Sequence, residues 1–429
     1  MFKNSRCFQL WIVLSVLLLS ACDKPSVGDT VYVIEGVSIS SDYMLMAVGD
    51  TENLQALIKP SDIVITTDFI KRNNLEGRIY WKSDNEKIAT VSPDGVVHAV
   101  GPGICNVSVV CGMYRATCRV EIRHFELAQL YGAWKAGTDS LFIDFDGTAR
   151  LGNVRYAFQF DGMRLNLMDD MGVKAKLILV SVNDSIVKYH DKLKESDRVL
   201  SLHRIAYCLD MSELLCNNKL VASKNDSLVM AVDMGLSDHT LWAMANLGSS
   251  SPELPGSLYA WAECDPRNKF SLESYKWYDQ TTCDLTKYME CSTPGAYCLD
   301  ASDDAAQSVL GSSWHVPSYN EMKVLFEECG LVWARLNGVD GALFLNKKSG
   351  LGGPKLFLPV KDTYADNNSK KNGVNAFVTG AYWTSSFSSV NPFNADYFSL
   401  SLKNCLHGAM GTAYRYSGIC IRPVWNGGN

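Results

Sequence analysis

The segment from Tyr114 to Arg123 alternates without a break between apolar and polar side chains. Successive side chains of a β-strand point to opposite faces of the sheet, so the pattern predicts a strand with one face on a core and the other in water. The predicted core face consists of Tyr114, Ala116, Cys118, Val120 and Ile122. This half-buried strand predicts a β-sandwich over residues 31–123.

A two-residue turn at Gly112-Met113 joins this strand to an alternating run before it. That turn places Cys111 opposite Tyr114 and Val107 opposite Cys118. Cys111 and Cys118 then do not face each other, which argues against a disulfide between them, although a longer turn would reopen the question. Cys118 is instead predicted to be a small buried hydrophobe.

Residues 31–123 also contain the motifs YWKSDNEKIATVSPDGVVHAVGPGICNVSVV and TCRVEI. These motifs resemble the bacterial Ig-like group 2 domain over nearly its whole length. The resemblance implies a spacer or adhesive module, in which Trp81 belongs to the core. An insertion between Pro60 and Tyr80 departs from the usual compact form.

Residues 124–222 are predicted to form an antiparallel β meander or small barrel, because short apolar runs are separated by Asp-Gly turns. A two-residue turn at Asp161-Gly162 would pair Phe158 with Leu165 and Tyr156 with Leu167 on one face. The motifs YGAWKA and LFIDFDGTA resemble the opening of lipocalin-like domains of surface lipoproteins. The span is short for a roomy eight-stranded barrel, so a structural connector is expected, with transport of a small apolar ligand as the alternative.

A polar linker is predicted at 223–228, followed by a C-terminal domain at 229–427 with six motifs in series. They read VDMGLSDHTLWAMANLG, SLYAWAE, WHVPSYNEMKVLFEECG, LFLPV, AYWTSSFSS and GICIRPV. The series resembles the FISUMP-type domain of surface lipoproteins from Gram-negative gut bacteria, a relative of the C-type-lectin-like and formylglycine-generating-enzyme folds. The resemblance implies an α+β, C-type-lectin-like binding module on the cell surface, and the fold class predicted for the whole chain is mainly β and multidomain.

Four tryptophans lie inside these motifs and are predicted to belong to the framework of the domain rather than to a sugar-stacking surface. They are Trp242, Trp261, Trp314 and Trp383.

One helix is predicted within these motifs. Ser318 and Glu321 form a capping box at its start, and Gly330 is expected to end it. Four apolar residues recur at positions i, i+3, i+4 and i+7, which predicts one helix stripe that faces the core. They are Met322, Leu325, Phe326 and Cys329.

The two ends of the C-terminal domain are expected to pair, as in the C-type-lectin-like fold. Leu241 to Asn246 would then meet the closing strand Ile419 to Val424. Arg422 is predicted to be buried in the framework with a carboxylate or carbonyl partner, since burying its charge alone would be costly.

Three loops remain as the candidate ligand surface, at 361–376, 387–396 and 405–416, because function concentrates in loops on a rigid scaffold. The candidate ligand-binding residues are Tyr364, Asp366, Asn367, His407, Tyr414, Arg415 and Tyr416. Oxygen ligands for calcium would come from Asp362, Asp366, Asn367 and Asn368. The usual calcium triplets of lectins are absent from the sequence, so no metal and no other cofactor is predicted.

The N-terminus reads as a lipoprotein signal over residues 1–22, followed by a linker at 23–30. An apolar stretch from Phe8 to Leu19 is too short to span a bilayer and ends in Leu19-Ser20-Ala21-Cys22, which matches a lipobox. Lipid on Cys22 would hold the protein to the membrane. An ordinary secretory signal with an incidental Cys22 is the alternative. By the enterobacterial sorting rule, Asp23 after the lipidated cysteine would mean retention at the inner membrane. In the lineages that the C-terminal domain resembles, acidic residues at this place are compatible with export, so the outer membrane, facing out, is favoured.

A net charge of −6 with mixed signs argues against a nucleic-acid-binding surface. The late cysteines Cys405 and Cys420 lack the close spacing of the formylglycine-generating active site, and no catalytic triad, carboxylate pair or zinc motif replaces them. The sequence therefore predicts a non-enzymatic, adhesin-like surface lipoprotein that binds a glycan or a host or bacterial surface protein. A subunit of a pilus-like surface assembly is the alternative.

Overall fold

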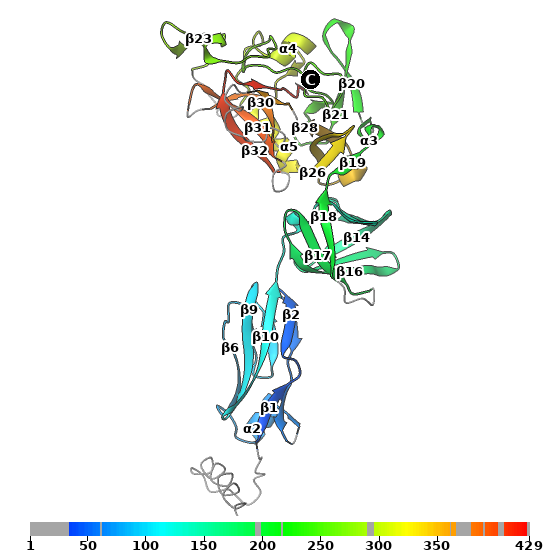
Figure 1. The fold of residues 1–429 in the computed structure, drawn as a ribbon, viewed down its shortest axis with the longest axis vertical. Coiled ribbons are helices and arrows are strands. Elements are labelled where there is room, and N and C mark those ends of the chain that lie inside the picture. Colours follow the sequence, from blue (N-terminus) through cyan, green and yellow to red (C-terminus); the bar gives the residue numbers. More distant parts are fainter. Residues whose placement is uncertain are drawn as a thin grey trace, which may run out of the picture. The chain divides into compact units, whose positions relative to one another are not determined.

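A computed structural model describes residues 34–60, 62–193, 199–215, 218–289, 296–360, 362–365, 379–388, 391–401 and 407–426. The chain forms two compact units, Met1–Arg123 and His124–Asn429. Both are built mainly from β-strands (Figure 1), as the sequence predicted. Cys22, predicted to carry lipid, lies outside the described residues.

The first unit is an Ig-like arrangement of small sheets with the strand orders β2-β10-β9-β6, β1-β4-β5 and β3-β8-β7. Its elements are β1 (Gly36–Ile39), β2 (Tyr43–Ala47), β3 (Thr51–Asn53), β4 (Ala56–Lys59), β5 (Ile63–Val64), α2 (Thr67–Arg72), β6 (Ile79–Ser83), β7 (Ala89–Val91), β8 (Val96–Ala99), β9 (Gly103–Cys111) and β10 (Tyr114–Arg123).

The β9–β10 hairpin confirms the predicted register. Cys111 pairs with Tyr114 and Val107 with Cys118. Cys111 and Cys118 both carry free thiols in the core of the unit. Burial raises the pKa of the Cys118 thiol to about 11, so it packs as a neutral hydrophobe.

Trp81 is buried in the same core, as predicted. The turn at Gly95 lies against its ring: φ there is +82°, and a Cβ would come within 2.9 Å of the indole and 2.3 Å of the Leu54 carbonyl oxygen. This close approach explains why glycine is required at that turn. The insertion between Pro60 and Tyr80 holds β5 and α2, whose N-cap is the Thr66 side chain.

The second unit begins with a closed eight-stranded barrel whose strands follow one another in sequence order. They are β11 (Gly132–Ala136), β12 (Asp139–Ile143), β13 (Thr148–Leu151), β14 (Val154–Phe160), β15 (Arg164–Asp169), β16 (Gly172–Val182), β17 (Ile186–Asp191) and β18 (Leu200–Ile205). Buried side chains such as Trp134, Leu165, Leu177 and Val187 form a packed cluster in the barrel, which fits a structural element.

The predicted register of the β14–β15 hairpin is wrong by two residues. Phe158 pairs with Leu167, and Phe160 pairs with Leu165. The turn is longer than two residues because the Asp161 side chain accepts hydrogen bonds from the backbone N–H groups of Met163 and Arg164. Four residues, 161–164, therefore separate the last ladder pair, two more than predicted, and a shift of two keeps the aromatic side chains on their predicted face.

In the remainder of the second unit, the described residues form short sheets, two short α-helices and one longer α-helix. Its elements are β19 (Tyr207–Leu209), α3 (Met211–Leu215), β20 (Asn218–Ala222), β21 (Leu228–Asp233), β22 (Leu241–Ala243), β23 (Tyr278–Asp279), β24 (Asp284–Leu285), α4 (Ala305–Leu310), β25 (Trp314–His315), α5 (Tyr319–Glu328), β26 (Cys329–Leu336), β27 (Val339–Asn346), β28 (Lys355–Pro359), β29 (Tyr364–Ala365), β30 (Thr379–Phe387), β31 (Asn394–Ser401), β32 (His407–Tyr414), β33 (Gly418–Ile419) and β34 (Val424–Trp425).

The segment 223–228, predicted as a linker, contains the turn of the β20–β21 hairpin. The hydroxyl of Ser223 donates to the carbonyl of Leu310, so this turn is attached to the C-terminal fold. Strand β19 likewise pairs in parallel with β26. Strand pairing with the C-terminal fold therefore begins near residue 207, before the predicted boundary.

The two ends of the C-terminal fold pair as predicted. In an antiparallel ladder, Leu241 lies opposite Trp425 and Trp242 opposite Val424. The four framework tryptophans are also buried as predicted. Their indole N–H groups find backbone acceptors in three cases, as buried polar atoms require: Trp261, Trp314 and Trp383.

Helix α5 confirms the capping box, since Ser318 and Glu321 bond reciprocally at its start. Its end differs from the prediction. The helix stops at Glu328, and Gly330 is already in strand β26. Glycine is needed there because the ring of Phe145, from the barrel, lies where a Cβ would be, within 2.4 Å.

Candidate functional site

The structure places the predicted ligand residues unevenly. Tyr364 lies in β29, opposite Ile419 of β33, and His407 is the first residue of β32. Asp366, Asn367 and Asn368 lie outside the described residues, which leave Asp362 as the one described member of the predicted calcium ligands. Of the predicted ligand residues, Tyr414, Arg415 and Tyr416 are those whose side chains the structure describes.

Tyr414 and Tyr416 form an aromatic pair at the end of β32. Their rings are stacked, with centroids 5.1 Å apart and planes inclined by 10°. Tyr414 is 54 % exposed, whereas Tyr416 is half-buried against the cluster around Phe270 and Tyr275. The pair therefore presents an aromatic face to solvent from a packed base.

Arg415, predicted to bind ligand, is fully buried, and this prediction is wrong. Its guanidinium donates to the carbonyl of Tyr288 (2.9 Å) and, at 3.4 Å, to those of Lys287 and Asn394. It also lies 4.7 Å from the centroid of the Trp261 ring and 4.6 Å from that of Phe387. Strand β32 ends at Tyr414, so Arg415 lies in the turn that follows, where its side chain is buried while that of Tyr414 stays exposed.

The backbone at Arg415 is held as firmly as its side chain. The Arg415 N–H donates to the carbonyl of Phe393, and its carbonyl accepts from the N–H of Trp261. These bonds connect the turn that carries Tyr414 and Tyr416 to two other segments of the fold. Arg415 therefore positions the aromatic pair without contributing to its surface.

A cluster of polar side chains around one buried carboxylate, that of Asp303, was not predicted from the sequence. Asp303, whose side chain is 3 % exposed, is bonded by Lys276 at 3.2 Å, by Lys287 and by the hydroxyl of Tyr288 at 2.7 Å. The ring of Trp277 lies 4.2 Å from one ammonium group and 4.9 Å from the other. Burial by itself would raise the pKa of Asp303, but its hydrogen bonds to Lys287, Tyr288 and Lys276 hold that pKa below the usual value. A fully bonded carboxylate of this kind stabilises the loops around it.

We expect Asp303→Asn to lower the free energy of unfolding by about 1–3 kcal/mol at pH 7. Because the pKa of Asp303 is lowered on folding, the stabilisation is present above the ordinary aspartate pKa of about 3.9 and is lost as the pH falls through the lower folded value. Melting curves recorded from pH 7 to pH 3 should show that the difference in melting temperature between wild type and variant becomes smaller as the pH falls.

The matched control is Asp300→Asn, which removes a carboxylate that also pairs with Lys287 but is 61 % exposed. We expect a change below about 1 kcal/mol at every pH. A gap for Asp303→Asn that stays constant down to pH 3 would contradict a role for its charge.

The buried cysteines of the C-terminal fold are not reactive thiols. Cys420 is fully buried and donates to the carbonyl of Ala381 at 3.0 Å, and burial raises its pKa well above the usual value. Burial raises the pKa of Cys329 to about 12. Since the thiolate is the nucleophile, neither group is prepared for catalysis. Cys405, the other late cysteine, is outside the described residues.

Within the described ranges, no three His, Cys, Asp or Glu side chains gather as metal ligands do. The helices in those same ranges are all too short or too polar to cross a membrane.

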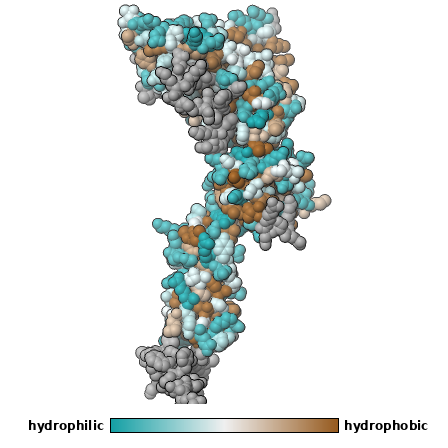
Figure 2. Space-filling view, viewed as in Figure 1, coloured by the Kyte–Doolittle hydropathy of each residue, from teal (hydrophilic) through white to brown (hydrophobic). Residues whose placement is uncertain are grey.

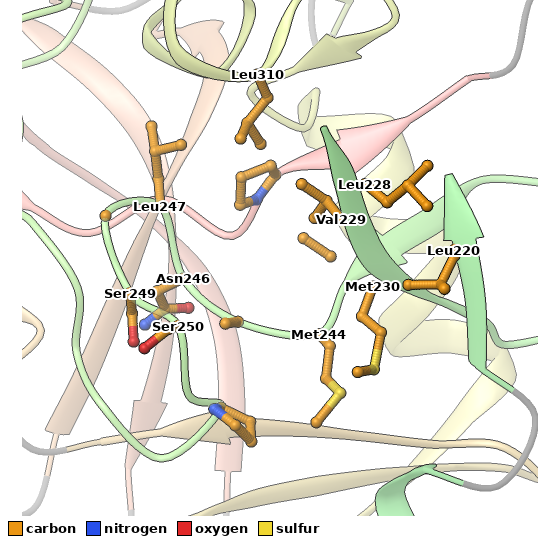
Figure 3. A pocket seen from close by; sticks show the side chains of 15 residues that line it. Leu220, Leu228, Val229, Met230, Met244, Asn246, Leu247, Ser249, Ser250 and Leu310 are labelled. Carbon is orange, nitrogen blue, oxygen red and sulfur yellow. The ribbon is translucent and has the colours of Figure 1, made fainter. Parts of the chain in front are cut away.

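An apolar groove of about 310 Å³ lies beside the β20–β21 hairpin. Figure 3 shows Leu220, Leu228, Met230 and Met244 on one side of it. Leu220 pairs with Met230, so both project from the same face of the hairpin, and both are exposed. On the face drawn in Figure 2, hydrophobic and hydrophilic residues are interspersed. None of the described side chains that line the groove is charged.

The sequence feature that could have pointed to this groove is the apolar run LVMAV in β21. Such a run is typical of a strand covered on both faces, but Leu228 and Met230 of this strand are exposed.

Residues 33–118 match the family described as bacterial Ig-like domain (group 2). This segment is a bacterial Ig-like domain. The match agrees with the sandwich predicted for residues 31–123 and with the buried Trp81 and the Gly95 turn. The match lies within the first unit and does not extend to the barrel or the C-terminal fold.

Among solved structures, similarity is found to domains of the S-layer protein SbsC. Domains 5–6 of that protein share 11 % identity over 49 % of this chain and 90 % of theirs, with a TM-score of 0.17. Domains 1–6 share 12 % identity over 49 % of this chain but only 22 % of theirs, with a TM-score of 0.19. TM-scores this low support no conclusion about fold or function. No curated protein matches the chain.

Proposed function

We propose that this protein is a lipid-anchored, non-enzymatic binding protein of the outer cell surface, which holds a glycan at the end of its C-terminal fold. The lipobox at Cys22 supports the anchor, and a bacterial Ig-like domain fits a spacer at a cell surface. The proposal includes a lipocalin-like connector at 124–222 and a C-type-lectin-like module at 229–427, on the motifs quoted for them.

The observation that carries the proposal is the stacked pair of Tyr414 and Tyr416. A sugar presents an apolar C–H face that packs well on an aromatic ring, while a tyrosine hydroxyl remains available for a hydrogen bond. The pair is held rigidly because Arg415 between them is bonded to three carbonyl groups. A surface ordered before binding loses little conformational entropy when a ligand arrives.

We expect Tyr414→Ala to weaken glycan binding by about tenfold or more, since an exposed aromatic anchor contributes at least about 1.4 kcal/mol. The measurement is a glycan-array screen of the protein from Ser26 onward, with calcium and then with chelator, followed by titration of the glycans that bind. Loss of binding on chelation would add a metal to the site.

Tyr80→Ala is the matched control, because Tyr80 in the Ig-like domain is 43 % exposed, close to the 54 % of Tyr414. It should bind as wild type does. Glycan binding that survives Tyr414→Ala unchanged would refute this location for the site. A blank array would instead favour a protein partner and the alternative of a surface-assembly subunit.

A further inference from the structure

A second recess, a cleft of about 710 Å³, lies within the second unit between the barrel and the sheet that contains β26. Small-molecule sites in proteins have volumes of about 300–1,000 Å³ and occur preferentially where two substructures meet. Among the residues that the structure describes, none of the predicted ligand loops lines this cleft, and neither Tyr414 nor Tyr416 does.

Four aromatic side chains line the cleft. Tyr131 and Phe145 come from the barrel side, with ring centroids 4.2 Å apart. Phe326 comes from α5 and Trp333 from β26. Phe326 belongs to the helix stripe that the sequence predicted to be buried, yet it is 37 % exposed. Its ring contacts Phe398 on one side, at 5.8 Å, and leaves an apolar surface toward the cleft.

The walls of the cleft are rigid. The ring of Phe145 packs directly over the backbone at Gly330. Arg204 donates to the carbonyls of Tyr131 (2.7 Å), Gln129 (2.6 Å) and Asp184 (2.8 Å) and lies 4.0 Å over the Trp134 ring. The guanidinium thus ties the two barrel segments of the lining together, so the cleft is formed before any ligand binds.

Two polar groups of the lining lack partners. The carboxylate of Asp184, exposed in the turn before β17, makes no hydrogen bond or ion pair in the part of the chain that the structure describes. The indole N–H of Trp333 is buried there without an acceptor. An unpaired buried N–H costs free energy, which an acceptor on a ligand can recover. The lining therefore offers the Asp184 carboxylate as an acceptor, and the Trp333 N–H and the Lys347 ammonium as donors, beside its aromatic rings.

We propose that this cleft binds a short saccharide. Flat aromatic walls match the C–H faces of sugar rings, and the Asp184 carboxylate is an acceptor for sugar hydroxyls. A purely apolar ligand would use the rings alone, whereas a saccharide can also bond the exposed Asp184 carboxylate and keep its polar edge in water. This site is separate from the one proposed at Tyr414, and each can exist without the other.

The test uses the same glycan array and variants of the protein from Ser26 onward. Phe326→Ala and Trp333→Ala each remove one aromatic wall and are expected to weaken binding of the cleft ligand by about tenfold or more. Trp425→Ala is the matched control, because Trp425 is also half-buried with an unpaired indole N–H but lies outside the cleft. It should leave binding within about twofold of wild type.

Tyr414→Ala separates the two sites. A glycan whose binding depends on Phe326 and Trp333 and not on Tyr414 occupies the cleft. If every bound glycan depends on Tyr414 alone, or if the array is blank, the cleft proposal is overturned. Thermal melting of each variant identifies loss by unfolding. Should Phe326→Ala melt early, Asp184→Asn in the exposed turn takes its place and is expected to weaken binding severalfold; unchanged binding in that variant would also overturn the proposal.

Discussion

Replacing Arg422 with leucine is expected to destabilise the C-terminal fold by about 3–5 kcal/mol. Arg422 is fully buried between the two ends of this fold. Its guanidinium donates to the side-chain oxygen of Asn246 at 2.7 Å and to the carbonyls of Ala243 (3.1 Å), Met244 and Phe357 (2.9 Å).

Leucine would leave these acceptors buried without donors, and each such group costs about 1–3 kcal/mol. The effect should be large because Arg422 joins Asn246 and Phe357, which lie in different segments of the fold. The β22–β34 pairing next to Arg422 would lose its support at the same time.

Urea denaturation followed by tryptophan fluorescence measures the change, since Trp242 and Trp425 lie in the paired strands. The control is Arg335→Leu, which removes an exposed arginine that pairs with Asp340 and should cost less than about 1 kcal/mol. A loss of unfolding free energy below about 1 kcal/mol for Arg422→Leu would show that the buried network does not hold the two ends together.

The second large effect is expected for Arg415→Ala, at about 3–4 kcal/mol. The change removes hydrogen bonds to three carbonyls and the contact of the guanidinium with the Trp261 and Phe387 rings. It also leaves a cavity in a packed region. Glycan binding at the Tyr414 and Tyr416 pair should disappear with it, because the turn that carries the pair is no longer held.

A comparison of stability with binding separates this positioning role from ligand contact. Tyr414→Ala should lose glycan binding, but its free energy of unfolding should stay within about 0.5 kcal/mol of wild type, as expected for an exposed side chain. Arg415→Ala should lose both. If Arg415→Ala melts like wild type and still loses binding, Arg415 contacts the ligand, and its burial in the free protein does not describe the bound state.

Local patterns in the sequence determined several features of this protein. The alternation of Tyr114 to Arg123 and the turn before it predicted the β9–β10 register, and the Ser318–Glu321 capping box predicted the start of α5. In each case, neighbours in sequence are also neighbours in space, so spacing is enough. The pairing of the two ends came from a resemblance in motifs, and the structure confirms it.

Tertiary structure alone decided which side of a pattern is covered. Arg415 and Tyr414 are adjacent residues in a predicted loop, yet one is fully buried and the other is 54 % exposed. Gly330 looked like a helix end, but the ring of Phe145, distant in sequence, requires glycine there. Phe326 has the spacing of a core residue and nevertheless lines a cleft. Burial depends on which distant segments pack against a face, and this information is absent from the spacing of residues within one segment.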